Sequence, residues 1–403
     1  GDASLCYIIQ MMRETEFLRK VREIGGKAYV VGGWVRDRLM GACPHDRDYV
    51  ICGLDEGTFA EAFPRAVKTG SSFPVFILTI DGTSCDVALA RTERKEGSGY
   101  RGFAVEYGPD VTIEEDLFRR DTTINSMAWS PEEDKLTDPF GGQADIKARL
   151  IRATSSHFCE DPVRALRAAR QAAEFDFTIE THTLERMRRC RHELSREPRE
   201  RIFGELKRVM NSGKPSVFFL MLAKADIIET VIPPLEHIWE SGSPDGGKAF
   251  KKAMYILDKT AGASERAEIR FASLARSVSS FLPEKSAVCV LEEINRTVRL
   301  PVLWSRCSEF AVMHLPDPSK GKDPAVTVDT LAVLQNHPIG IDGCAAITKA
   351  EGTIDSYPFL ANSELYLETM KKARAELPLA IEGKARAEWI RERQIEAVSK
   401  LLL

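Results

Sequence analysis

A change in hydrophobic pattern near residue 150 constrains the fold of this chain more than any other feature. Before it, short apolar runs rich in β-branched residues alternate with Gly, Pro and Asp, a pattern typical of strands. After it, apolar residues recur at helical spacing through most of the remaining sequence. We therefore predict an α+β fold, in which a head with a mixed sheet precedes an all-helical region. Strands are expected at residues 28–31, 48–52, 75–80 and 85–90, with a short helix at residues 35–40.

The 403 residues of the chain allow two or three domains. Helical spacing that ends at two glycines predicts a helical extension over residues 1–26, followed by the strand-rich head over residues 27–151. A helical neck is expected over residues 152–215, with a break at residues 176–179. Residues 216–403 then form the predicted helical body and tail.

Composition excludes several classes of protein. Hydrophobic residues make up 43% of the chain, and no apolar run approaches the roughly 20 residues of a membrane span. The N-terminus lacks the basic-then-apolar pattern of a signal peptide, so we expect a cytoplasmic protein without a membrane segment. The nine cysteines include no Cys-x-x-Cys pair and the seven histidines no His-Glu-x-x-His motif, which argues against a zinc site or a disulfide framework.

The first chemical signal is a strand that runs into two glycines and then into a helix, at residues 30–37 (VVGGWVRD). Gly32 and Gly33 would let backbone N–H groups approach a phosphate, and Arg36 would add positive potential. An ordinary tight turn between a strand and a helix explains the same residues. Both interpretations stay open on this segment alone.

A close pair of carboxylates follows. Asp46 and Asp48 begin the next expected strand, and their spacing of two places both on one face of it. Two carboxylates held together repel each other unless a divalent cation lies between them, so the pair indicates a cation site. The alternative is that both carboxylates belong to a solvated surface turn. Asp86 lies between apolar neighbours on a later strand, and is either a third catalytic carboxylate or an edge-strand charge.

Residues 119–125 (RRDTTIN) place two arginines before an aspartate. The guanidinium of Arg120 suits phosphate oxygens, while Asp121 is positioned to accept a hydrogen bond from a ribose hydroxyl or to cap a helix. The acidic run at residues 114–116, just before this segment, is expected to form a solvated turn.

Another basic segment follows a helix start at Asp161 and Pro162. Arg164, Arg167 and Arg170 lie on one broad face of this helix, where surface salt bridges are the common explanation. Residues 164–208 contain twelve Lys and Arg against eight Asp and Glu, in a chain whose net charge is −4. This local excess, and the repulsion among the arginines, favour a phosphate or RNA partner.

In this order, the segments resemble the motifs of the class II tRNA nucleotidyltransferases, the CCA-adding enzymes, which share their catalytic head with bacterial poly(A) polymerases. Residues 32–37 with 46–48 resemble the first family motif, and residues 119–125 the second. Residues 138–145, 160–164 and 200–206 resemble three further motifs. Five motifs in the right order are far more specific than any one of them.

The resemblance implies a polymerase-β-like nucleotidyltransferase head with a five-stranded mixed sheet, and a helical neck, body and tail. It also implies a reaction in which the 3′-hydroxyl of tRNA attacks the α-phosphate of CTP or ATP and releases pyrophosphate. Asp46 and Asp48 would hold two Mg²⁺ ions, with Asp86 completing the catalytic carboxylates. The nucleotide-binding residues would be Gly32, Gly33, Arg36, Arg120, Asp121, Asp161, Arg164, Arg167 and Arg170.

The family uses no nucleic-acid template, and two of these residues suggest how the chain selects its bases. Cytosine and adenine both present an amine donor beside a ring-nitrogen acceptor, which an acceptor and a donor in the protein would match. Asp161 and Arg164 supply that pair. Guanine and uracil present the reverse order and would leave buried groups unsatisfied at about 1–3 kcal/mol each, so we expect GTP and UTP to be rejected.

Alternative functions remain open within and outside the family. The charged, glycine-containing loop expected at residues 91–101 suits terminal A addition, but it does not separate a full CCA enzyme from one that adds only A. Residues 45–48 (HDRD) and 72–76 (SFPVF) differ from the matching poly(A) polymerase segments, which disfavours that activity. An inactive RNA-binding scaffold would have no use for the close pair Asp46 and Asp48.

The predicted tail departs from many relatives. Arg276 and Ser277 stand where those relatives have the His-Asp pair of a metal-dependent phosphohydrolase. We therefore expect a degenerate tail without that activity.

Overall fold

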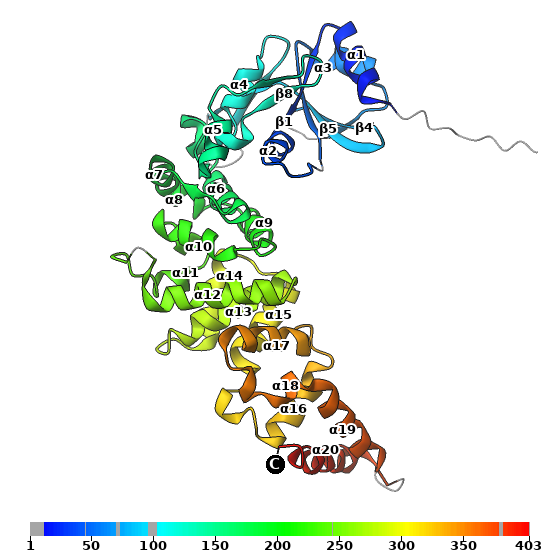
Figure 1. The fold of residues 1–403 in the computed structure, drawn as a ribbon, viewed down its shortest axis with the longest axis vertical. Coiled ribbons are helices and arrows are strands. Elements are labelled where there is room, and N and C mark those ends of the chain that lie inside the picture. The colour runs from blue at the N-terminus through cyan, green and yellow to red at the C-terminus, as the bar shows by residue number, and fades with distance from the viewer. Residues whose placement is uncertain are drawn as a thin grey trace, which may run out of the picture. The chain divides into compact units, whose positions relative to one another are not determined.

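The computed structural model describes residues 12–44, 46–69, 73–95, 103–243, 245–378 and 382–402. The chain forms two compact units, Gly1–Glu197 and Pro198–Leu403. Within the described residues, all strands belong to the first unit and the second is built from helices (Figure 1). The predicted α+β organisation, with a sheet-containing head followed by helices, is confirmed.

The head contains a mixed sheet of seven strands in the order β3-β4-β5-β2-β1-β8-β9, where five strands were expected. β2 runs parallel to β5, and the other neighbouring pairs are antiparallel. β3, β8 and β9 have three residues each, which is too short to produce a hydrophobic pattern in the sequence. The strands are β1 (Lys27–Val31), β2 (Asp48–Cys52), β3 (Val67–Thr69), β4 (Val75–Ile80), β5 (Thr83–Leu89), β8 (Ala128–Ser130) and β9 (Lys135–Thr137).

Short helices connect and cover the strands of the head. A separate hairpin of β6 (Arg91–Lys95) and β7 (Phe103–Tyr107) occupies part of the segment that was expected to be a loop. The expectation was therefore wrong for residues 91–95, and residues 96–102 lie outside the described part of the chain. The helices of the head are α2 (Gly33–Leu39), α3 (Glu56–Ala62), α4 (Ile113–Phe118), α5 (Gly142–Ala148) and the short 3₁₀ helix η1 (Thr123–Asn125).

The helix α1 (Glu14–Glu23) belongs to the core of the head. Its apolar side chains Phe17, Leu18 and Val21 are buried against the sheet, and the Phe17 ring lies 5.1 Å from the ring of Tyr49 on β2. Burial of these side chains stabilises the helix far more than its own backbone hydrogen bonds do. Residues 14–23 are thus an integral part of the head, and residues 1–11 lie outside the described part of the chain.

Helices that were expected to form a neck pack within the same unit as the head. They are α6 (Val163–Phe175), α7 (Thr181–Arg189) and α8 (Arg191–Leu194), preceded by the 3₁₀ helix η2 (Ser156–Glu160). The predicted break at residues 176–179 is present, because Asp176 takes a left-handed conformation and β11 (Thr178–Ile179) then pairs with β10 (Leu150–Ile151). This pairing ties α6 to the end of the head. The expected domain boundaries after residues 151 and 215 stay predictions. The division of the chain into two compact units falls after Glu197.

The second unit has an apolar core between its helices. In α13 (Ala267–Ser280), Arg276 donates to Glu351 at 2.8 Å and to the carbonyl of Ala311 at 2.7 Å. Arg276 therefore anchors neighbouring helices of this unit. The remaining helices are α9 (Arg199–Val209), α10 (Pro215–Lys224), α11 (Pro233–Glu236), α12 (Gly247–Ala263), α14 (Ala287–Thr297), α15 (Val302–Glu309), α16 (Pro324–Leu334), α17 (Gly340–Glu351), α18 (Pro358–Ala361), α19 (Ser363–Ala375) and α20 (Gly383–Ser399).

Candidate active site

The two glycines lie where β1 ends and α2 begins. Gly32 has a φ of +69°, a left-handed conformation that side chains rarely tolerate, which explains a glycine at this turn. A Cβ atom on Gly32 would lie 3.5 Å from Nη1 of Arg120, and one on Gly33 would lie 3.3 Å from Nη2 of Arg36. The structure thus brings the guanidinium groups of both predicted arginines beside the glycine turn.

The predicted carboxylates meet where the interior strand β2 begins, beside the interior strand β5, and we call this place the carboxylate edge. Asp48, the first residue of β2, pairs in register with Asp86 on the parallel strand β5, which places both on one face. The pKa of Asp48 is raised, first by loss of hydration and then by the negative charges of Asp86 and Asp46, while Arg120 opposes the shift. All three carboxylates are exposed on the head. The third carboxylate that the sequence suggested is therefore beside the first two.

The oxygen donors of this carboxylate group are the ligands that Mg²⁺ and other hard divalent cations prefer. Loss of hydration is the largest cause of the raised pKa of Asp48, and a bound cation would relieve the smaller contribution from the negative charges of Asp86 and Asp46. Within the described residues, no group of three or more His, Cys, Asp or Glu side chains is arranged so that it could hold a metal ion as it stands. Only the oxygen chemistry and the negative charge of these carboxylates suit a divalent cation.

A buried carboxylate holds the two arginines of the second motif. Asp116, on α4, has no exposed surface and accepts from Arg119 at 2.8 Å and from Arg120 at 2.9 Å. Burial alone would raise the pKa of Asp116, but the two guanidinium groups outweigh it and lower the pKa to about 2. The expectation of a solvated acidic turn was therefore wrong: residues 114–116 belong to the helix α4, and although Glu114 and Glu115 are exposed, Asp116 is buried and positions Arg120.

Arg36 is fixed from two sides. Its Nη1 donates to Oδ1 of Asn125 at 2.7 Å, and its Nη2 pairs with Asp37 at 2.7 Å. The guanidinium also lies over the ring of Phe175, at 4.4 Å from the ring centroid. Because Phe175 ends α6, this contact links the glycine turn to the helix that carries the other predicted arginines.

Asp121 is held by the same helix. Its Oδ2 accepts from Nε2 of Gln171 at 3.1 Å, and its Oδ1 accepts from the backbone N–H of Thr122 at 2.7 Å. The Thr122 hydroxyl in turn donates to Oε1 of Gln171 at 2.6 Å. Asp121 does not cap η1, which begins after Thr122, so the capping interpretation is not supported. Gln171 escaped the sequence analysis, although a polar residue on the buried alanine-rich face of α6 was a visible signal.

Asp161 and Arg164 lie at the first turn of α6, as expected. Oδ1 of Asp161 accepts from the backbone N–H of Val163 at 3.2 Å. Arg164 is buried, and its guanidinium donates to the carbonyl of His157 at 2.6 Å and pairs with Glu93 of β6 at 3.5 Å. The structure thus gives Arg164 two partners that the sequence did not indicate. Both partners also line a cavity of about 460 Å³, whose walls include Phe118 and Phe140.

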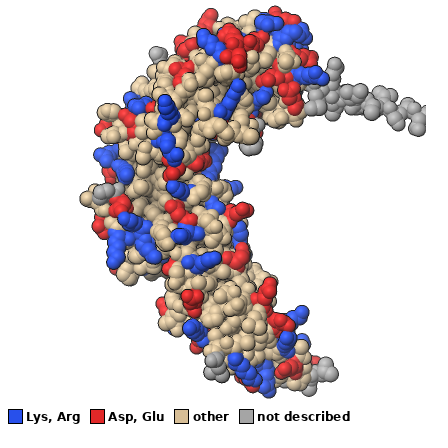
Figure 2. All heavy atoms as spheres, in the orientation of Figure 1, with Lys and Arg blue, Asp and Glu red and all other residues tan. Residues whose placement is uncertain are grey.

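Arg170, further along α6, is also paired within the chain. Arg170 binds Glu174 at 2.7 Å, and Arg167 is half-buried. The repulsion that was expected to require an external anion is therefore partly neutralised by the chain itself. Positive charge remains on the neighbouring helices, since the last turn of α7 carries Arg186, Arg188 and Arg189. Figure 2 shows basic and acidic side chains interspersed over this part of the surface.

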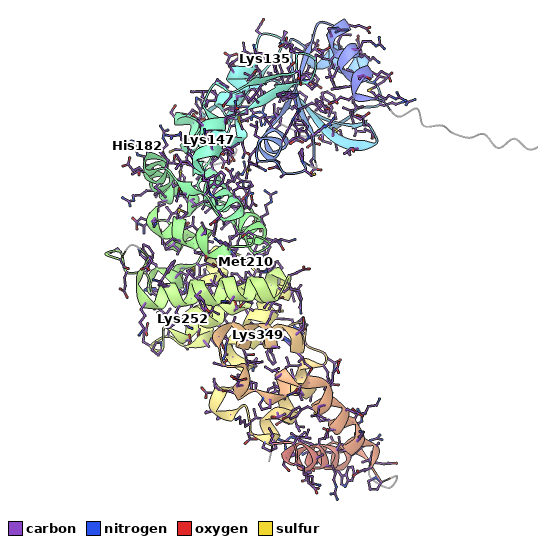
Figure 3. The ribbon with its side chains drawn as sticks, viewed as in Figure 1. Lys135, Lys147, His182, Met210, Lys252 and Lys349 are labelled. Carbon is purple, nitrogen blue, oxygen red and sulfur yellow. The ribbon has the colours of Figure 1, made fainter. Side chains whose placement is uncertain are left out.

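Figure 3 shows the side chains of the head and of the helices next to it, with Lys147 on α5 and His182 on α7 labelled. Arg120 links the glycine turn to the carboxylate edge, and Arg36 links the same turn to the second motif. α6 is joined to them by Gln171 and Phe175. None of the described helices is long and apolar enough to cross a membrane.

Known proteins resemble this chain in sequence and in fold. Residues 28–152 match the family model described as the poly A polymerase head domain, and residues 176–238 match the probable RNA- and SrmB-binding site of polymerase A. The multifunctional CCA protein of Cupriavidus metallidurans is 38% identical over 312 residues, which cover 71% of this chain and 73% of that protein. The multifunctional CCA protein of Chromobacterium violaceum is 37% identical over 305 residues, covering 71% of this chain and 73% of that protein.

Solved structures share the fold. A CCA-adding enzyme with ATP superposes with a TM-score of 0.67 at 23% identity, covering 97% of this chain and 91% of that one. The Bacillus stearothermophilus CCA-adding enzyme in complex with CTP gives a TM-score of 0.62 at 22% identity, covering 95% and 90% of the two chains. With a relative this similar over most of both sequences, the chain belongs to the family of the multifunctional CCA proteins.

Proposed function

We propose that this chain is a template-independent tRNA nucleotidyltransferase that adds CCA, from CTP and ATP, to the 3′ end of tRNA. One observation carries the proposal: Arg120 reaches the glycine turn and also acts on the charge of Asp48. A triphosphate held at that turn would therefore have its α-phosphate next to the carboxylate edge. We infer that the reaction takes place in the cytoplasm.

The catalytic carboxylates in this proposal are Asp46, Asp48 and Asp86. Asp46 and Asp48 would hold divalent cations, which we propose to be Mg²⁺. When bound, the cations lower the pKa of the attacking 3′-hydroxyl and neutralise charge on the triphosphate. The protein supplies the carboxylate oxygens on adjacent strands, so the attacking and leaving oxygens are oriented by a rigid sheet.

The basic residues of the head bind the triphosphate. Gly32 and Gly33 allow close approach of the backbone, while Arg36 and Arg120 pair with phosphate oxygens. Both guanidinium groups are already held by protein contacts, to Asn125 and Asp116 respectively, so little side-chain entropy is lost when a nucleotide binds. Arg167 and Arg170 would lie further along α6, toward the nucleotide phosphates or the tRNA end.

Asp121 would accept a hydrogen bond from the ribose, in the orientation that Gln171 fixes. Asp161 and Arg164 would read the base edge. For Arg164 to do so, the incoming base must replace its contacts with Glu93 and the His157 carbonyl, and only a base that offers a matching acceptor repays that loss. Cytosine and adenine meet this condition, whereas guanine and uracil present a donor at that place.

The proposal is tested by the length of the added tail. A tRNA transcript without its terminal CCA and an unstructured RNA of equal length are incubated with the chain, CTP and ATP. Addition that stops after three nucleotides on the tRNA supports the proposal. Long tails on either RNA with ATP alone would identify a poly(A) polymerase, and one A added only to tRNA ending in CC would identify an A-adding enzyme.

A further inference from the structure

Two cysteine thiols meet beside the base-reading segment. Cys159, in η2, donates to the carbonyl oxygen of Arg186 with an Sγ–O distance of 3.5 Å. Cys190, at the junction of α7 and α8, donates to the same oxygen at 3.3 Å. A single carbonyl oxygen therefore gathers two sulfur atoms from segments that are 31 positions apart in the sequence.

The two sulfurs differ in access to solvent. Cys190 is 2% exposed, whereas Cys159 is only half-buried. The neighbouring Cys159 thiol and burial both raise the pKa of the Cys190 thiol. A dissolved oxidant would therefore reach Cys159 first, and Cys190 is in place to react with the product.

The position of the pair connects it to Asp161 and Arg164. Cys159 lies two residues before Asp161, and η2 also contains His157, whose carbonyl accepts from Arg164 at 2.6 Å. The guanidinium of Arg186 donates to the carbonyl of Ser155 at 2.9 Å, at the start of the same segment. A covalent bond from Cys159 to Cys190 would therefore act on residues 155–161 as a unit and replace the shared hydrogen bonds to Arg186.

We propose that Cys159 and Cys190 form an oxidisable dithiol that a peroxide converts to a disulfide, and that this bond alters base selection at Asp161 and Arg164. The thiolate of Cys159 attacks one peroxide oxygen, the O–O bond breaks, and water leaves after protonation. The sulfur of Cys190 then attacks the resulting sulfenic acid, forming the S–S bond and releasing a second water. Two thiols lose two electrons and two protons in total, and the peroxide is reduced to two waters.

The proposed change in base selection rests on the proposed nucleotidyltransferase function, whereas the proposed disulfide does not. Among the described residues, no other two cysteines donate to a common oxygen. Cys307 and Cys344 have no exposed surface, and Cys289 is half-buried but donates to Glu293 at 3.5 Å. Cys289→Ser is therefore the matched control, because it removes one half-buried thiol elsewhere in the chain.

The experiment treats the full-length chain with hydrogen peroxide and then blocks the remaining thiols. Peptide mapping without reduction should find Cys159 joined to Cys190, with the mass of two hydrogen atoms lost and restored by dithiothreitol. Cys190→Ser and Cys159→Ser should each prevent the link, and Cys289→Ser should retain it. Either of the first two variants suffices if the other fails to fold. Absence of the Cys159–Cys190 link, while other cysteines become oxidised, would overturn the proposal.

Base selection is then measured on the same samples. Oxidised chain should change its ratio of A to C incorporation at least about fivefold relative to reduced chain, with recovery after dithiothreitol. Peroxide should leave this ratio unchanged in Cys190→Ser. A disulfide with an unchanged ratio would overturn the coupling to Asp161 and Arg164. Failure of the reduced wild-type chain to extend tRNA at all would instead contradict the proposed function.

Discussion

Gln171 of α6 donates a hydrogen bond from its side-chain amide to Oδ2 of Asp121 at 3.1 Å, 50 positions away in the sequence. Gln171 is 1% exposed, and its amide oxygen accepts from the Thr122 hydroxyl at 2.6 Å. The helix thus orients the carboxylate that we assign to ribose binding. A hydrogen bond to a charged group contributes about 1.5–3 kcal/mol, so its loss should be measurable.

The variant Gln171→Leu should raise the KM for CTP and for ATP together by roughly tenfold, because Asp121 loses its orienting partner. The ratio of C to A incorporation should stay constant, since the base-reading residues are untouched. Steady-state kinetics on tRNA check this, with the exposed Gln335→Leu as a control for removing an amide. If the correctly folded Gln171→Leu variant has an unchanged KM, Gln171 does not contribute to nucleotide binding.

Asp48→Asn should reduce nucleotide addition at least about a hundredfold, because it removes one of the carboxylates that we assign to the divalent cations. The tRNA affinity, measured by filter binding, should be retained. Addition at wild-type rates would mean that the metal assignment is wrong.

The same variant makes a prediction about stability. A raised pKa means that the ionised form of Asp48 destabilises the folded state, and this cost appears as pH rises through the pKa range of the carboxyl. Asp48→Asn should therefore raise Tm in EDTA at neutral pH by roughly 1–3 °C. Mg²⁺ should raise the Tm of the wild type more than that of the variant, as thermal melts with and without the ion would show. Exposed Asp355→Asn serves as the control, and an equal Mg²⁺ effect on all three proteins would contradict the cation site.

Asp116→Asn should destabilise the first unit by about 3–5 kcal/mol, because it leaves the guanidinium groups of Arg119 and Arg120 together without their buried carboxylate. Urea denaturation measures this, with exposed Asp110→Asn as the control. A depressed pKa stabilises the folded state above the ordinary value of 3.8, and this contribution is lost as pH falls toward about 2. The stability gap between wild type and Asp116→Asn should therefore narrow over that range, and a gap independent of pH would argue against the buried ion pair.

Arg164→Ala should relax the choice of base. Without its guanidinium, the site loses the donor that matches cytosine and adenine, and incorporation of G and U should rise roughly tenfold relative to C and A. Competition assays with all four nucleotides measure this ratio. If Arg164→Ala still incorporates only C and A, Arg164 does not read the base.

The sequence predicted the charged residues of the site better than their partners. Asp46, Asp48 and Asp86 were singled out because close carboxylates and a carboxylate between apolar strand residues are unusual, and the structure pairs Asp48 of β2 with Asp86 of β5, while Asp46 lies just before β2. Asp116 was misjudged, although its spacing of three and four from Arg119 and Arg120 is the spacing of ion pairs on a helix. Local composition suggested a solvated turn, whereas tertiary packing buries the carboxylate.

Partners distant in the sequence could not be derived from pattern alone. The contacts of Arg164 with Glu93 and of Asp121 with Gln171 join segments about 70 and 50 positions apart, and no periodic signal records such pairings. The strands β3 and β9 were missed for a different reason. Each has three residues at a sheet edge, where hydrogen bonds to one neighbour define the strand and few side chains are buried.

The central claim is template-independent CCA addition, and single-nucleotide electrophoresis of a labelled tRNA tests it most directly. The tRNA lacks its last three nucleotides and is incubated with Mg²⁺ and CTP alone, ATP alone, or both. We predict two added nucleotides with CTP alone, none with ATP alone, and three with both. A tRNA that remains unextended with both nucleotides, or that grows a long tail with ATP alone, would contradict the claim.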